Sequence, residues 1–495
     1  MAISLESLTR FSRVGLVLSL FAPIAGFAQL LPAPLQEPRP APAQPAPALP
    51  DSTPITPDSD SLPHADMQVR TGSVLSGAQQ TTDTLRLTNL LDDHQYLGLE
   101  ALLQAPIADN LTPTDRSLLK GVLAARENRP HESIADLASI VANLPSHPLP
   151  PQTEKLLRRT LALDYLHLND FGAASAAFNE LAASPSITPA ELDEIELPLK
   201  MLPLATQNPP MTVEYGDAFS IPYDRDPLGL MEVPVFVDAH SHDWLFDPTA
   251  PFNLLARSTA HLIGLKLSEQ TTTVRGITGR PIQVHSTIIP RLTVGDITFR
   301  NVTAFVYEDA DYFYPHNRYQ IRGVLGYPAI SALGSITVTQ SGRIEVQPGE
   351  KGERLTKGAR FFLDGEQVLV ALGKPGEERV FQVDASGQQT YLTSRYFAEH
   401  SDDFAGQKAQ LLQVPGSAGK APAPAYMGQR VTLLIGSTEV TLPEIQVLTD
   451  PLGSSAIDPT YGVLGMDLLD ELKSYTFDYR TMRFAVETQA HAGVL

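Results

Sequence analysis

The second half of the chain repeats one pattern: an apolar, strand-like run, an aspartate, and a later GVLG segment. In the first copy 76 residues separate Asp247 from Gly323, and in the second copy 78 separate Asp384 from Gly462. The two copies are the segments 233–330 and 368–469. Both are rich in β-branched residues and in Gly, Pro and Asp turn signals, which is typical of strands. The repeat therefore predicts two similar β-rich lobes, each with an aspartate in an equivalent place.

An aspartate at the end of an apolar run is costly to bury unless it is paired or hydrogen-bonded. Such an acid is either a solvated turn residue or a working group. A single copy leaves both interpretations open, whereas two acids in equivalent places favour a working pair. After Asp247, the apolar residues from Leu254 onward have helical spacing and lead to Gly264, which predicts a helix there.

The order of apolar hairpin, aspartate loop, strand and helix, glycine-bearing hairpin and GVLG segment resembles the pepsin and retropepsin aspartic peptidases. The resemblance extends over about 215–487 and is greatest to the bilobed bacterial secreted members. It implies that Asp247 and Asp384 form a catalytic dyad that cleaves polypeptides without a cofactor. Two close carboxylates cannot both ionise easily, so the pair holds one proton. The ionised acid then deprotonates water, while the protonated acid polarises the peptide carbonyl.

The resemblance also implies roles for residues around the dyad. Bracing of the aspartate loops is expected from Thr249, Ala250, Ser386 and Gly387. The flap hairpins are expected to carry Gly276, Gly279, Gly416 and Gly419. The glycines that pack beneath the dyad are expected to be Gly323, Gly326, Gly462 and Gly465.

The aspartate loops depart from the Asp-Thr-Gly pattern of that family. The first loop reads DPTA at 247–250, and the second reads DASG at 384–387. Pro248 has neither a hydroxyl nor an N–H, and Ala385 has no hydroxyl, although both loops carry a hydroxyl residue one place later. Two functions therefore stay open. The chain is either an aspartic endopeptidase or a catalytically inactive relative that binds an extended peptide or a protein partner in the cleft between the lobes.

The region before the repeat has apolar residues at helical spacing, interrupted at Asn128–Pro130 and at Asn169–Asp170. The pair Leu118-Leu119 recurs 38 residues later as Leu156-Leu157, and each half is expected to be a helical hairpin. This region resembles tetratricopeptide repeats. A capping-box sequence at 188–191 predicts one more helix, giving about five. The helices are expected to serve either as a docking surface for a protein partner or as a structural support for the β-rich region.

The N-terminus has the features of an export signal. Two arginines precede a short apolar run and small residues in 1–28, so we expect cleavage near Ala28 and a periplasmic or secreted protein. The proline-rich segment 29–63 is expected to be an extended linker. No later segment is apolar over a membrane-spanning length. A formal net charge of −20 argues against nucleic acid as a partner.

These features predict a multidomain α and β protein, in which an N-terminal α-helical repeat domain precedes a mainly-β, bilobed acid-protease fold. The expected segments are a signal peptide at 1–28, a linker at 29–63, a helical-repeat domain at 64–208, and lobes at 209–349 and 350–490. His240 and His242 are two residues apart, so in a strand both would lie on one face, as two metal ligands could. No third ligand follows at a signature spacing, so no metal site is expected. The absence of HExxH, GxSxG and phosphate-loop motifs gives no support to other hydrolase or nucleotide-binding classes.

Overall fold

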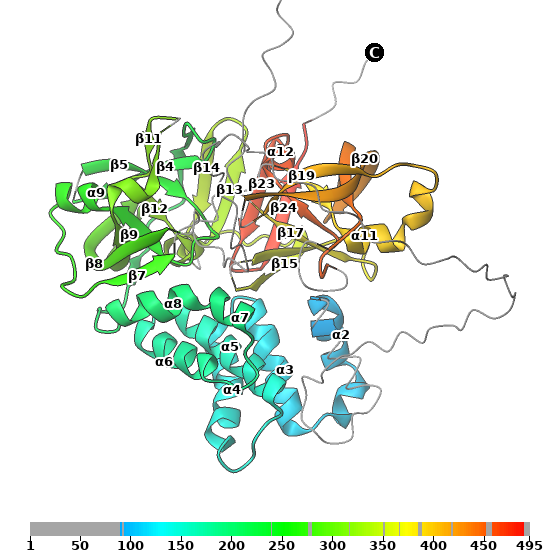
Figure 1. The fold of residues 1–495 in the computed structure, drawn as a ribbon, viewed down its shortest axis with the longest axis horizontal. Helices are drawn as coiled ribbons and strands as arrows, with labels where there is room; N and C mark the ends of the chain where they lie inside the picture. Colours follow the sequence, from blue (N-terminus) through cyan, green and yellow to red (C-terminus); the bar gives the residue numbers. More distant parts are fainter. Residues whose placement is uncertain are drawn as a thin grey trace, which may run out of the picture. The chain divides into compact units, whose positions relative to one another are not determined.

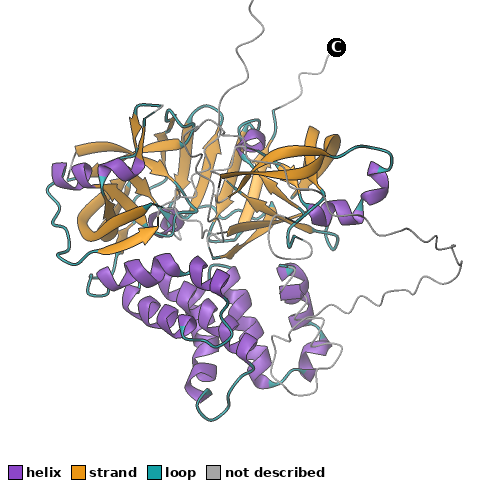
Figure 2. Ribbon diagram, viewed as in Figure 1, coloured by secondary structure: helices purple, strands orange, loops and turns teal. Residues whose placement is uncertain are grey.

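A computed structural model describes residues 90–489, except 92–93, 239, 276–279, 316, 350–351, 366, 385–388, 417–418 and 452–457. The expected signal peptide, the proline-rich linker and the start of the helical region up to residue 89 lie outside the described residues. Helices dominate the described chain up to about residue 204, and strands dominate from residue 212 onward (Figures 1 and 2). Within the described residues, no helix combines the length and apolarity that crossing a bilayer requires.

Four long helices form two helix–turn–helix units in the N-terminal part. They are α3 (Pro113–Arg126), α4 (Pro130–Asn143), α5 (Pro151–His167) and α6 (Phe171–Ala182). The predicted interruptions are confirmed, because the turns centre on Asn128 and Asn169, with positive φ of 54° and 57°. Asparagine tolerates this left-handed conformation better than most residues, which explains its use in both tight turns.

Seven whole α-helices, α2 to α8, lie in the described part of the helical region, where about five were expected. The additional helices are short: α2 (Tyr96–Gln104), α7 (Pro189–Glu194) and α8 (Glu196–Met201), with 3₁₀ turns at Pro106–Asn110 and Leu202–Leu204. The single helix expected after residue 188 is split at Ile195 into α7 and α8. Helices of six residues give too few apolar positions for their boundaries to be detected from periodicity.

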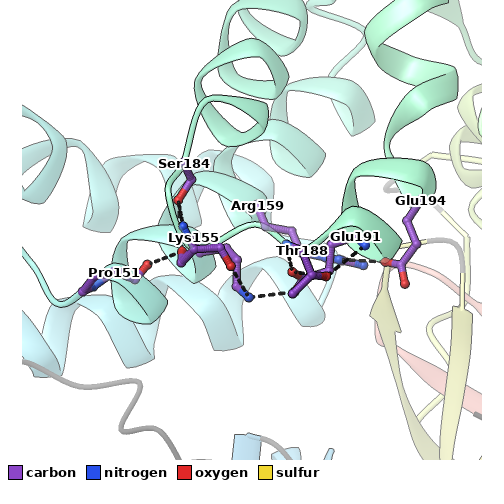
Figure 3. Close-up of polar contacts among 8 residues, drawn as sticks. Pro151, Lys155, Arg159, Ser184, Thr188, Glu191 and Glu194 are labelled. Carbon is purple, nitrogen blue, oxygen red and sulfur yellow. Dashed lines mark hydrogen bonds and ion pairs between the residues drawn. The ribbon is translucent and has the colours of Figure 1, made fainter. Parts of the chain in front are cut away.

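The predicted capping box at the start of α7 is present. The amide of Glu191 donates to the Thr188 hydroxyl over 3.2 Å, and the amide of Thr188 donates to the Glu191 carboxylate over 2.8 Å. Lys155 of α5 also reaches Glu191 at 2.7 Å, and Arg159 reaches Glu194 at 3.2 Å (Figure 3). These contacts fasten α7 to α5.

Among the described residues, nine strands form a first sheet. They are β1 (Thr212–Glu214), β3 (Asp224–Arg225), β4 (Met231–Val237), β5 (His240–Phe246), β6 (Asn253–Ala256), β7 (Thr272–Arg275), β8 (Pro281–Val294), β9 (Ile297–Tyr307) and β12 (Gly323–Leu325). The strand order is β1-β9-β6-β12-β5-β4-β8-β7, with β3 on β4. The short hairpin of β10 (Phe313–Tyr314) and β11 (Tyr319–Gln320) precedes β12.

Thirteen strands of the described chain form a second sheet. They are β2 (Phe219–Pro222), β13 (Ser335–Thr339), β14 (Arg343–Gln347), β15 (Ala359–Asp364), β16 (Gln367–Leu372), β17 (Arg379–Val383), β18 (Tyr391–Leu392), β19 (Gln410–Gly416), β20 (Gly419–Ile435), β21 (Thr438–Leu448), β22 (Gly462–Leu464), β23 (Ser474–Asp478) and β24 (Arg483–Glu487). Strands β13 and β14 precede residue 350 but belong to this sheet, because β13 pairs with β23. The second sheet therefore includes strands from before residue 350, where the second lobe was expected to begin.

The two copies of the repeat have the same local strand pairing. In the first, β12 is parallel to β5 and antiparallel to β6, and β6 is parallel to β9. In the second, β22 is parallel to β17 and antiparallel to β18, and β18 is parallel to β21. Each copy continues into a short helix after its GVLG segment, α10 (Tyr327–Ile330) or α12 (Met466–Leu469). The GVLG segment is thus the central strand at each site.

The helix expected from Leu254 to Gly264 begins later than its spacing indicates. Residues Asn253–Ala256 form β6, and only Arg257–Leu262 form a helix, α9. All four residues of β6 are buried, and its apolar side chains join two different buried clusters, Leu255 one and Leu254 and Ala256 the other. A short apolar run that is buried on both faces has no alternation to distinguish it from a helix. Gly264 ends the helix with φ of +73°.

The helices share apolar cores with the strands. One buried cluster joins Leu166 and Phe178 of α5 and α6 to Leu245 and Phe252 of the first copy of the repeat. Another joins leucines of α3 and α5 to Phe362 of β15. The apolar faces of these helices are therefore covered in part by the β-rich region.

Candidate active site

The predicted acids lie directly after equivalent strands. Asp247 follows β5, and its amide donates to the carbonyl of Leu325 over 3.1 Å. Asp384 follows β17, and its amide donates to the carbonyl of Leu464 over 2.9 Å. Each aspartate is thus fixed to the third residue of its GVLG segment.

Thr249 supplies two hydrogen bonds to the carboxylate of Asp247. Its amide donates to Oδ1 over 2.9 Å, and its hydroxyl donates to the same oxygen over 2.6 Å. The amide of Ala250 donates to the backbone carbonyl of Asp247 over 3.2 Å, which closes the loop into a tight turn. Pro248 has no amide N–H, but these contacts do not need one, because both groups that donate to the Asp247 carboxylate belong to Thr249.

Burial raises the pKa of Asp247 to about 6, against the effect of the Thr249 hydrogen bonds, which lower this pKa. The negative charge of Asp384 raises the pKa of Asp247 further, so the two carboxyl groups interact electrostatically. Asp247 is 9% exposed, and Asp384 is partly exposed. A buried acid beside a second, more accessible acid can keep a proton at a pH where an isolated aspartate is ionised.

The four predicted glycines of the GVLG segments have no room for a side chain. A Cβ at Gly323 would lie closer than 3.0 Å to the Trp244 ring, and one at Gly326 would meet the carbonyls of Ala250 and Phe252. In the second copy, a Cβ at Gly462 or Gly465 would meet the backbone of Tyr391 or Gln389 at similarly short distances. Close backbone approach under both aspartate loops therefore requires glycine.

Two polar residues that the sequence interpretation missed hold the GVLG segments. The amide of Gly326 donates to Oδ1 of Asn253 over 3.0 Å, and the amide of Gly465 donates to the hydroxyl of Thr390 over 2.8 Å. Thr390 in turn donates to the carboxylate of Asp467 over 2.6 Å. Asn253 and Thr390 each follow their aspartate by six residues, and this shared spacing was the signal that could have identified them.

The remaining predicted residues are placed as follows. Gly416 ends β19 and pairs with Gly419 at the start of β20, as expected for a hairpin. The first flap is expected between β7 and β8, which pair, but Gly276 and Gly279 lie outside the described residues, as do Ser386 and Gly387. His240 and His242 occupy β5 at the end distant from Asp247. No group of three or more potential metal ligands occurs within the described part of the chain.

Comparison with known proteins supports part of this interpretation. Residues 233–329 match the aspartyl protease family model, a range that includes Asp247 and the first GVLG segment but not Asp384. Among solved structures, a retropepsin-like aspartic protease from Rickettsia conorii matches with 17% identity and a TM-score of 0.20, covering 27% of this chain and 99% of that chain. No curated protein matches the chain. The β-rich region therefore contains an aspartyl protease-like domain, at 233–329.

Proposed function

We propose that this chain is an aspartic endopeptidase in which Asp247 and Asp384 form the catalytic pair, in a cleft between two lobes related by the sequence repeat. The observation that carries the proposal is the environment of Asp247. Its carboxyl group is buried, is oriented by Thr249, and has a pKa of about 6 that the charge of Asp384 helps to raise. General acid–base catalysis near that pH needs a group with this property.

In this mechanism the pair holds one proton between its two carboxyl groups. The ionised carboxylate takes a proton from a water molecule, which attacks the peptide carbonyl, while the protonated carboxyl group donates a hydrogen bond to the carbonyl oxygen. Among the described residues, both Thr249 contacts fall on Oδ1 of Asp247. The other carboxylate oxygen of Asp247, Oδ2, receives neither of these hydrogen bonds and is therefore the atom left to meet the water molecule or the substrate.

A second candidate function is the binding of an extended peptide without cleavage. Pro248 and Ala385 stand where the family has threonine, whose hydroxyl braces the opposite loop. A hydroxyl has a single proton to donate, and that of Thr249 already goes to Asp247. Thr249 therefore cannot donate to the second loop at the same time, and this favours a loop pair less firmly braced than in the family.

Hydrolysis of a broad peptide mixture, read by mass spectrometry from acid to neutral pH, separates the two functions. We expect cleavage by the purified wild type and none by Asp247→Asn or Asp384→Asn, with both variants still folded. Cleavage that persists in both variants would remove these aspartates from the mechanism. A wild type that cleaves no peptide at any pH, but binds them, would leave the second function.

Export and the role of the helices are also part of the proposal. The sequence of 1–28 supports an exported protein that acts outside the cytoplasm, and mass spectrometry of the mature N-terminus tests it by asking whether the chain begins near Gln29. A protein partner on the exposed faces of the helices stays a prediction, to be tested by co-purification with and without the helical region.

A further inference from the structure

The turn between α3 and α4 contacts α10 and the turn after β23, which are distant parts of the chain, through one side chain, Asn128. The hydroxyl of Tyr327 donates to Oδ1 of Asn128 over 2.9 Å, and Nδ2 of Asn128 donates to the carbonyl of Tyr479 over 3.3 Å. The Tyr479 carbonyl can only accept, so it fixes the orientation of the amide and leaves Oδ1 for Tyr327. Asn128 thereby joins the helical region to α10 and to the turn after β23.

Tyr327 connects this contact to the first aspartate loop. It follows Gly326 directly, and its amide donates to the carbonyl of Ala250 over 2.8 Å. The amide of Ala250 in turn donates to the carbonyl of Asp247. Three successive contacts therefore lead from Asn128 to the backbone of the buried acid.

The Tyr327 side chain is enclosed on the helical side. It is 8% exposed, and the ring of His167, at the end of α5, lies 4.6 Å from it between centroids. The ring of Tyr479 lies 6.2 Å away, nearly perpendicular. A buried tyrosine hydroxyl needs hydrogen-bond partners; Asn128 accepts its proton, and Ser331, four residues further along the chain, is a second hydrogen-bonding neighbour.

Among the described residues, the second copy of the repeat has no equivalent of this contact. The residue after its GVLG segment is Met466, which is 3% exposed and has no hydroxyl. The connection through Tyr327 is therefore specific to the loop that carries Asp247, the acid whose pKa is raised.

We propose that Asn128 is a positioning residue that holds the Asp247 loop through Tyr327, so that the helical region is an integral part of the active centre. This inference rests on the proposed peptidase function for its kinetic consequence, but the mechanical connection stands independently. Loss of the Asn128 side chain is expected to loosen the loop at Ala250 and Asp247. Misplacement of a catalytic group lowers the rate of the chemical step more than it weakens binding.

The test uses glycine variants of the full chain at two matched turns. Asn128→Gly removes the side chain at a position where glycine adopts the positive φ without strain. Asn169→Gly makes the same change in the α5–α6 turn, and no hydrogen bond of its side chain is known among the described residues. Tyr327→Phe removes only the hydroxyl and serves as the second variant if Asn128→Gly folds poorly.

Amide hydrogen exchange of 247–256 is the first measurement. We expect exchange to be faster by about tenfold in Asn128→Gly and in Tyr327→Phe, with no further increase in the double variant, since both remove the Tyr327–Asn128 hydrogen bond and the other bond of Asn128, to the Tyr479 carbonyl, does not lead to this loop. Asn169→Gly should leave exchange in this segment unchanged. Equal exchange in wild type, Asn128→Gly and Tyr327→Phe would overturn the proposal, as would an equal increase in Asn169→Gly.

Kinetics of peptide cleavage is the second measurement. We expect kcat to fall by about tenfold in Asn128→Gly and Tyr327→Phe with KM nearly unchanged, and to stay at the wild-type value in Asn169→Gly. A rise in KM alone would contradict a positioning role. A wild type that cleaves nothing would refute the peptidase function, and hydrogen exchange alone would then decide the connection between Asn128 and the loop.

Discussion

At the scale of single residues, Thr249 accounts for how an altered loop still holds its acid. Proline at 248 removes an N–H, but the amide and hydroxyl of Thr249 both reach Oδ1 of Asp247. These bonds lower the pKa of Asp247, whereas burial and the charge of Asp384 raise it, and burial is the largest effect. The outcome is a pKa of about 6 in place of 3.8. The loop therefore orients the carboxyl group without forcing it to ionise.

The raised pKa predicts a pH-dependent effect of Asp247→Asn on stability. The pKa of Asp247 is higher in the folded state than the ordinary value of 3.8, so the destabilisation of the fold by ionisation grows between pH 3.8 and about 6 and reaches about 3 kcal/mol above that range. Asparagine keeps an Oδ1 for Thr249 but never ionises. We expect the variant to be more stable than wild type at pH 7.5 by about that amount, and equal to it near pH 4.

Urea unfolding at the two pH values measures this difference. Asp217→Asn, at an exposed acid, is the matched control and should change stability little at either pH. A variant that is less stable than wild type by the same amount at both pH values would show that its effect does not depend on the ionisation of Asp247, against this account.

At the scale of elements, a buried ionic contact fastens the helices to the second sheet. Asp364, at the end of β15, lies 2.9 Å from the Arg126 guanidinium and accepts a hydrogen bond from Tyr96 over 3.0 Å. Burial alone would raise the pKa of Asp364, but Arg126 and His94 outweigh it and hold this pKa well below its usual range. The carboxylate is therefore ionised in the folded protein, and Arg126 is paired.

Removal of one partner of this contact should be far more harmful than replacement of both. Asp364→Ala leaves Arg126, which is 6% exposed, without its carboxylate, and we expect a loss of about 3–5 kcal/mol of unfolding free energy. Arg126→Met combined with Asp364→Leu should restore most of it. Lys473→Ala, at an exposed ion pair with Glu487, is the control and should cost less than about 1 kcal/mol. Chemical denaturation measures all three, and a double variant as unstable as Asp364→Ala would contradict the account.

Helix boundaries could be predicted from the sequence where they depend on the residues close by. The helix breaks at Asn128 and Asn169 and the capping box at Thr188 were correct because turn and cap chemistry is local. Most of strand β6 was expected to be helical, because the pairing that makes it a strand is with β12 and β9, which are distant in sequence. Tertiary pairing outweighed local spacing there.

At the scale of the whole chain, the sequence repeat predicted that two GVLG segments would lie beside two aspartates, and the strand pairing in both copies agrees. The contacts that join the helices to this centre could not be predicted. Asn128 and Tyr327 are 199 residues apart, and neither residue carries a motif. A contact of this kind depends on how two distant regions pack together, and no local pattern in a single sequence reveals that packing.

The pH dependence of cleavage tests most directly whether Asp247 and Asp384 act together as a pair that holds one proton. For a peptide that the wild type cleaves, we expect kcat/KM to fall by about tenfold per pH unit above about 6, where the pair loses that proton. The Asp247→Asn and Asp384→Asn variants should show no cleavage across the same range. A kcat/KM that stays constant from pH 5 to pH 8, or cleavage that persists in either variant, would contradict the account.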